Sequence, residues 1–91
     1  MAKELIISGR VQGVFCRDYC NKNAKSLGLK GVASNLKDGT VQVILDSVDE
    51  QIIQKFIKSL KDNPHNYRFY GKIDNITIND YNGFIRGDYI F

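Results

Sequence analysis

The chain has 91 residues, 43% of them hydrophobic and 25% charged, and a formal net charge of +3. This length and composition are typical of one small globular domain, so we expect residues 1–91 to share a single core. The basic residues are scattered along the chain rather than clustered, which argues against a dedicated nucleic-acid surface. No apolar stretch approaches the roughly 20 residues that a membrane-spanning helix needs, so we expect no membrane partner.

The first residues and the two cysteines indicate in which cellular compartment the protein is expected. Residues 1–4 lead directly into a strand pattern, without the apolar segment of a secretion signal. Cys16 and Cys20 are spaced one helical turn apart. They are too few for a disulfide framework, and a C-x-x-x-C spacing without further ligands does not indicate a zinc site. We therefore expect free, buried thiols and a cytoplasmic location.

A strand, a loop and a helix are predicted at the start of the chain. The strand covers residues 3–9, because Leu5-Ile6-Ile7 is apolar and partly β-branched. The loop covers residues 10–15. The helix runs from Cys16 to Leu27, with one apolar stripe of small residues, and Gly28 is placed to end it in the left-handed conformation.

The loop before this helix has the features of an anion-binding site. The first N–H groups of a helix lack internal acceptors, and Gly13 can take a positive φ that turns loop N–H groups inward. Arg17 opposes the helix dipole, so a cation at this position suggests a negatively charged partner. Arg10 lies at the other end of the loop. The alternative is that both arginines point into water, and the loop has neither the Walker A nor the G-x-G-x-x-G pattern.

A tight hairpin is predicted next. Residues 31–37 and 40–45 have strand patterns, and Asp38-Gly39 between them is a strong hairpin signal. Val41, Val43 and Leu45 share a parity and are expected to face the core. Asn35 is unusual inside a strand, where it would share a face with Ala33. Solvent exposure or a bulge is the alternative explanation for it.

The second half of the chain contributes a helix and two further strands. Ser47 and Glu50 fit a capping box, followed by an amphipathic helix from Val48 to about Leu60. Residues 63–66 form a turn whose histidine, His65, is expected to be exposed rather than catalytic. Residues 67–70 interleave aromatics with an arginine, for which packing is the favoured role over RNA binding. Strands are predicted over 73–80 and, with a bulge near Gly87, over 84–91.

These elements follow the order β-α-β-β-α-β, with one further strand at the C-terminus. The order predicts an α+β fold, a ferredoxin-like α/β sandwich whose antiparallel sheet carries two helices on one face. Such a fold accommodates many unrelated functions, so the function must be argued from the site.

Two motifs resemble the acylphosphatase family over nearly the whole chain. The first is Gly9-x-Val11-Gln12-Gly13-Val14-x-x-Arg17. The second centres on Asn35, eighteen residues later, and is followed by Asp38-Gly39-x-Val41. The resemblance implies that Arg17 and the loop hold the phosphate of an acyl phosphate, and that Asn35 holds the attacking water. The phosphate-binding loop then consists of Gln12, Gly13, Val14, Phe15, Cys16 and Arg17.

The implied activity is hydrolysis of acyl phosphates to a carboxylate and inorganic phosphate by a monomer, without a metal or another cofactor. The carboxylate is already a good leaving group, so positioning and charge neutralisation suffice. Asn35 cannot act as a base near neutral pH, so we expect a phosphate oxygen to accept the proton of the water. The chain departs from the family pattern beside the site, at Cys16, Val32, Ser34 and Ser47.

Two other functions remain open from the sequence. An RNA-binding module on the same fold would need paired aromatics on the central strands, where Val41 and Val43 stand instead. A non-catalytic domain that senses anions would keep the loop and Arg17 but would have no need of Asn35.

Overall fold

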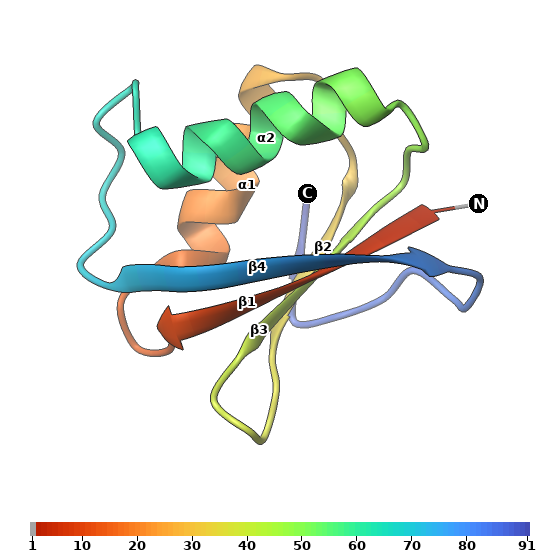
Figure 1. Cartoon of the computed structure of the whole chain (residues 1–91). Helices are drawn as coiled ribbons and strands as arrows, with labels where there is room; N and C mark the ends of the chain where they lie inside the picture. Colours follow the sequence, from red (N-terminus) through yellow and green to blue (C-terminus); the bar gives the residue numbers. More distant parts are fainter. Residues whose placement is uncertain (1) are drawn as a thin grey trace.

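The computed structural model describes residues 2–91, which form one five-stranded sheet and two helices. The strands are β1 (Ala2–Arg10), β2 (Gly31–Asn35), β3 (Val41–Leu45), β4 (Lys72–Tyr81) and β5 (Tyr89–Ile90), and the helices are α1 (Cys16–Ser26) and α2 (Glu50–Asp62). The sheet order is β4-β1-β3-β2-β5 and every pair is antiparallel. Both helices lie on one face of this sheet (Figure 1). The predicted ferredoxin-like fold is confirmed.

The core lies between the helices and the central strands. Leu5 and Ile7 of β1 and the three predicted residues of β3, Val41, Val43 and Leu45, are completely buried in it. The alternation in these strands therefore gives the expected result, since every second side chain of a strand points to the same face. Neither helix within residues 2–91 is long and apolar enough to cross a membrane.

Helix α1 packs closely because its buried stripe consists of small residues. Cys20 and Ala24 are completely buried, and both cysteines are free thiols, as predicted. A hydrogen bond with Cys16, together with burial, raises the pKa of the Cys20 thiol. Tyr19 is the large residue on this helix: it stacks on Phe69 with 4.7 Å between ring centroids. Burial raises the pKa of Tyr19 to about 12.

The start of α2 differs from the prediction. Asp49, not Ser47, is the N-cap: its Oδ1 accepts hydrogen bonds from the N–H groups of Gln51 (3.0 Å) and Ile52 (3.3 Å). Ser47 Oγ accepts only from Asp49 N, so no capping box forms with Glu50. Val48 therefore precedes the helix and is 55% exposed. Both Ser and Asp favour cap positions, and Asp49 lies closer to the first apolar turn.

The predicted last strand is also shorter than expected, because only Tyr89 and Ile90 pair with β2. Gly87 packs directly against Ser34 and Val32 of β2, where an added Cβ would overlap Ser34 Oγ. The next N–H, that of Asp88, donates to Ser34 Oγ at 3.0 Å. A side-chain contact thus replaces the strand pairing before Tyr89, and residues 82–88 form a loop beside the sheet, which we call the C-terminal strap.

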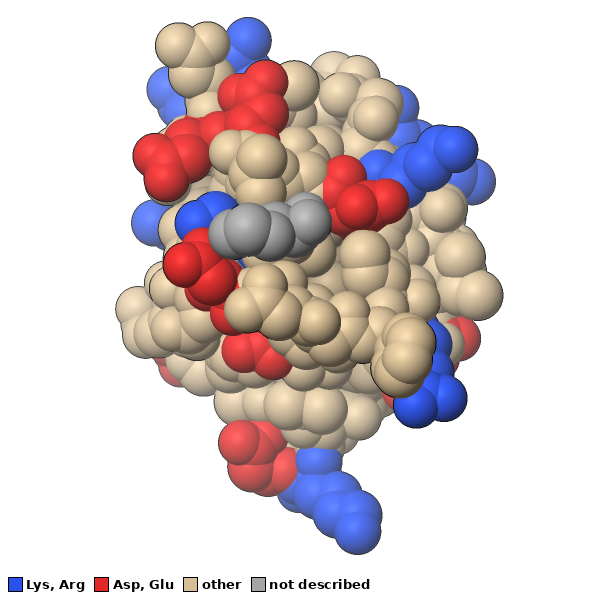
Figure 2. Space-filling model, turned by 90° about the vertical axis from the view of Figure 1, so that its right-hand side faces the viewer, with Lys and Arg blue, Asp and Glu red and all other residues tan. Residues whose placement is uncertain are grey.

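The surface charge is mixed. On the face drawn in Figure 2, acidic and basic side chains are interspersed over a largely uncharged surface. This pattern agrees with the small net charge of the chain.

Candidate functional site

The loop between β1 and α1 has the conformation of an anion cradle. Gly13 has φ +73°, as predicted, and Phe15 also has a positive φ of 68°. Phe15 is the N-cap of α1 but makes no capping hydrogen bond with its side chain. Left-handed residues in such a loop turn neighbouring N–H groups toward one side, and the helix N-terminus adds partial positive charge there. The left-handed Phe15 was not predicted, because non-glycine residues seldom adopt this conformation.

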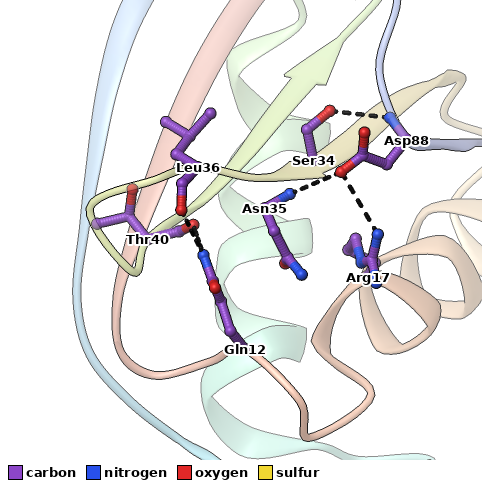
Figure 3. A network of polar contacts seen from close by, with 7 residues as sticks. All are labelled: Gln12, Arg17, Ser34, Asn35, Leu36, Thr40 and Asp88. Carbon is purple, nitrogen blue, oxygen red and sulfur yellow. Dashed lines mark hydrogen bonds and ion pairs between the residues drawn. The ribbon is translucent and has the colours of Figure 1, made fainter.

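The cradle is fixed to the β2–β3 hairpin by Gln12. Its Nε2 donates to the carbonyl oxygens of Leu36 at 2.7 Å and Thr40 at 2.9 Å (Figure 3). Gln12 was predicted as part of the phosphate-binding loop. Its side chain connects that loop to the hairpin that carries Asn35.

The other side of the cradle is held by the segment before β4. Tyr70 N–H donates to Val14 O at 3.1 Å, and the Tyr70 ring meets the Phe15 ring edge-on. The guanidinium of Arg68 lies 3.9 Å from the centre of the Phe15 ring. This segment was expected to pack rather than bind RNA, and these contacts give Arg68 and Tyr70 a packing role beside the cradle.

The two arginines of the loop have different environments. Arg10 Nη2 donates to Tyr70 O at 2.9 Å, so its guanidinium is engaged by a backbone carbonyl. Arg17 lies in the first turn of α1 with its side chain 39% exposed, and its Nη1 is 3.4 Å from Asp88 Oδ2. Arg17 lines the cleft beside the cradle and Arg10 does not.

Asn35 is the last residue of β2 and shares a face with Ala33, as predicted. Its backbone N–H donates to Asp88 Oδ2 at 3.1 Å. The side-chain amide points away from Asp88, toward the space between Gln12 and Arg17 (Figure 3). No hydrogen bond to the rest of residues 2–91 engages that amide, so it is available to a ligand or a water molecule.

A cleft of about 280 Å³ lies between the cradle and the end of β2. The residues that line it are Val11, Gly13, Phe15, Cys16, Arg17, Asp18, Asn35 and Tyr89. The structure therefore brings together Arg17, Asn35 and most of the predicted loop. Gln12 and Val14 do not line the cleft, and Cys16 is 2% exposed.

Asp88, Tyr89 and Asp18 are site residues that the sequence did not reveal. Asp88 contacts Arg17 and Asn35, while the Tyr89 hydroxyl donates to Asp18 Oδ1 at 3.0 Å. Asp18 also lies 3.3 Å from Lys22, one turn further along α1. The only local signal was Gly87, which marked an irregularity but not its contacts. Among residues 2–91, no three His, Cys, Asp or Glu side chains gather where they could hold a metal ion.

Comparisons with known proteins agree on one family. The family model described as Acylphosphatase matches residues 3–87. An acylphosphatase-like protein of Methanocaldococcus jannaschii is 48% identical over 58 residues, which are 64% of this chain and 38% of that protein. An acylphosphatase of Methanocella arvoryzae is 43% identical over 63 residues, covering 69% of this chain and 70% of the relative.

Solved structures agree with these relatives. The crystal structure of acylphosphatase from Bacillus subtilis superposes with a TM-score of 0.75 and 25% identity, over 99% of this chain and 98% of that one. The matched part of the chain spans well under half of the M. jannaschii relative, but most of the M. arvoryzae one.

Proposed function

Because this chain belongs to the acylphosphatase family, we propose that it hydrolyses the carboxyl–phosphate bond of acyl phosphates. The observation that carries the proposal is the meeting of Arg17 and Asn35 at one cleft, beside a loop with two left-handed residues. The family relationship supplies the reaction class, and the arrangement of these groups suits it.

The cradle binds the phosphate group of the substrate. Backbone N–H groups of residues 12–17 and the N-terminus of α1 offer donors and partial positive charge to a dianion. Arg17 adds a planar set of donors that matches two phosphate oxygens better than a lysine would. Because one Arg17 nitrogen faces Asp88, the others remain available to phosphate.

Asn35 positions the attacking water. The water oxygen forms a bond to phosphorus while the bond between phosphorus and the acyl oxygen breaks, and that electron pair leaves with the carboxylate. A phosphate oxygen accepts the proton of the water, so the products at the site are a carboxylate and dihydrogen phosphate, which then loses a proton to solvent near neutral pH. Asn35 orients the water through its amide and takes no proton itself. Positioning and charge neutralisation account for catalysis of this kind without a protein nucleophile.

Hydrolysis of benzoyl phosphate in EDTA, followed by ultraviolet absorbance, tests the proposal. Wild type is expected to turn over without added metal. Arg17→Ala is expected to lose activity together with affinity for inorganic phosphate. Asn35→Ala is expected to keep phosphate binding and lose about 10²–10³ in kcat, by analogy with the loss of one preorganised donor.

Matched controls are available on exposed surfaces of the same chain. Arg86→Ala removes an arginine that lies over Phe84 rather than in the cleft, and Asn79→Ala removes an exposed asparagine of β4. Both should resemble wild type. Equal losses of phosphate binding in Arg17→Ala and Asn35→Ala would contradict the division of roles. Phosphate binding without any turnover would favour a non-catalytic anion sensor.

A further inference from the structure

A single carboxylate oxygen contacts both residues to which we assign the reaction. Asp88 Oδ2 accepts the backbone N–H of Asn35 at 3.1 Å and lies 3.4 Å from Arg17 Nη1. Arg17 comes from α1 and Asn35 from β2, while Asp88 belongs to the end of the C-terminal strap. Figure 3 shows the carboxylate between the two, on the side away from Gln12.

Asp88 is itself held in place from both sides along the chain. Its N–H donates to Ser34 Oγ at 3.0 Å, and Ser34 is buried in β2. The preceding residue, Gly87, packs against Ser34 and Val32 so closely that a side chain would not fit. The following residue, Tyr89, pairs with Ala33. The backbone under this carboxylate is therefore fixed to the same strand that carries Asn35.

We propose that Asp88 is a positioning residue that fixes the Arg17 guanidinium relative to the end of β2. The proposal rests on the function proposed above, in which Arg17 binds phosphate and Asn35 holds water. An arginine side chain has many rotamers, and a half-exposed one at a helix terminus needs a partner to keep it in a single orientation. Asp88 supplies that partner from a fixed backbone.

The contact suits orientation better than competition with the substrate. Its N–O distance of 3.4 Å exceeds the 2.7–2.9 Å typical of a strong charge-assisted hydrogen bond, and it uses one guanidinium nitrogen. The two side chains are 39% and 51% exposed, so solvent screens their attraction. The remaining Arg17 nitrogens can therefore bind phosphate without displacing Asp88.

Asp88 also completes the hydrogen bonding of β2. Pairing with β5 reaches only Val32 and Ala33, so the N–H of Asn35 lies beyond the paired part of that edge. The carboxylate accepts this N–H in place of a strand partner. Loss of Asp88 would thus free both the guanidinium and the backbone that carries the asparagine.

Because Asp88 is negatively charged, its removal should affect phosphate binding and turnover differently. A carboxylate near the site repels a phosphate dianion, so its removal is not expected to weaken ground-state phosphate binding. The loss of alignment should appear in kcat instead. We expect Asp88→Ala to lower kcat by about 10- to 100-fold, because small misplacements of reacting groups have effects of this size. The dissociation constant of inorganic phosphate should stay within about threefold of wild type.

Three further variants sharpen the test. Asp88→Asn keeps an oxygen that can accept the Asn35 N–H but loses the charge, and should lie between wild type and Asp88→Ala in kcat. Ser34→Ala removes the acceptor for the Asp88 N–H and should lower kcat in the same direction by a smaller factor. Asp80→Ala is the matched control, because it removes an exposed carboxylate that pairs with Lys3 and lies on β4, the strand at the opposite edge of the sheet from β5.

Amide NMR gives a readout that does not depend on turnover. In wild type, the Asn35 N–H should be protected from hydrogen exchange and the Arg17 Nε signal should show an ordered side chain. Asp88→Ala should lose both features, whereas Asp88→Asn should keep the protection at Asn35. A wild type without turnover but with these NMR changes would refute the proposed function and leave the positioning contact established.

Other outcomes would overturn the role of Asp88 while the proposed function stands. A tighter phosphate complex with a higher kcat/KM in Asp88→Ala would show that the carboxylate competes with substrate. Unchanged kcat with a lower melting temperature would show a purely structural residue. Loss of the acidic limb of the pH–rate profile in Asp88→Asn would identify a general base instead.

Discussion

Gln12 offers the clearest way to separate the cradle from the hairpin that carries Asn35. Its side chain donates two hydrogen bonds to hairpin carbonyls, at 2.7 and 2.9 Å, from a half-buried position. Each such bond contributes about 0.5–1.5 kcal/mol, so Gln12→Ala should lower the free energy of unfolding by roughly 1–3 kcal/mol. In a domain of this size, each kcal/mol corresponds to a decrease of about 4–8 °C in melting temperature.

The same variant should also lose activity, because the hairpin is no longer tied to the phosphate-binding loop. We expect kcat for benzoyl phosphate to decrease by roughly tenfold, the low end of what misplacement of a positioned group causes. Gln42→Ala is the matched control: Gln42 Nε2 donates a single bond to Glu4 Oε2, away from the cleft. Gln42→Ala should lower the free energy of unfolding by less than Gln12→Ala and should leave kcat unchanged. Equal kinetics for the two variants would refute a coupling between cradle and hairpin through Gln12.

Two further predictions concern stability. Asp49→Ala should lower the free energy of unfolding by about 1 kcal/mol and Ser47→Ala by less, since only Asp49 caps α2. Urea denaturation of both variants checks this, and a larger loss in Ser47→Ala would indicate that Ser47 is the N-cap. Burial raises the pKa of Tyr19 from 10.0 to about 12. The protonated hydroxyl therefore contributes fully to the free energy of unfolding below pH 10, and this contribution is lost as the pH rises through 12. Tyr19→Phe should remove this part of the alkaline loss of stability, as measured by denaturation at a series of pH values, and an unchanged pH profile would contradict the assignment.

Local patterns were sufficient to predict the fold, the loop before α1 and an anion-binding role for Arg17, whereas the role of Asn35 followed from the family resemblance. Alternation in β1 and β3 identified the buried face, and Asp38-Gly39 indicated the hairpin that carries Asn35. The loop is longer than predicted, because β2 ends at Asn35 and β3 begins at Val41. Each of these signals lies within a few residues of what it predicts. The family motifs added a second constraint by relating Arg17 to Asn35 across the chain, and the structure places both at the same cleft.

The error at the C-terminal strand and the omission of Asp88 share a physical cause, which is contact between distant residues. The strand predicted over 84–91 had suitable β propensity, but packing of Gly87 on β2 and the bond from Asp88 to Ser34 leave only Tyr89 and Ile90 paired. No pattern within the C-terminal segment encodes a neighbour more than 50 residues away. Asp88 therefore could not be assigned to the site from sequence.

The charge of Arg17 illustrates how the structure changes the argument for an anion site. Two arginines near a helix N-terminus suggested a negatively charged ligand, yet Arg10 binds a backbone carbonyl and Arg17 faces Asp88. The cations thus have partners within the protein, and their sign alone does not require a phosphate. The backbone conformation of the loop supports an anion site more strongly than its charge does. Gly13 and Phe15 adopt left-handed backbone conformations, which for Phe15 cost free energy, and they do so beside the unengaged amide of Asn35. A strained cradle next to a free hydrogen-bonding group is the arrangement that a bound phosphate and its attacking water would explain.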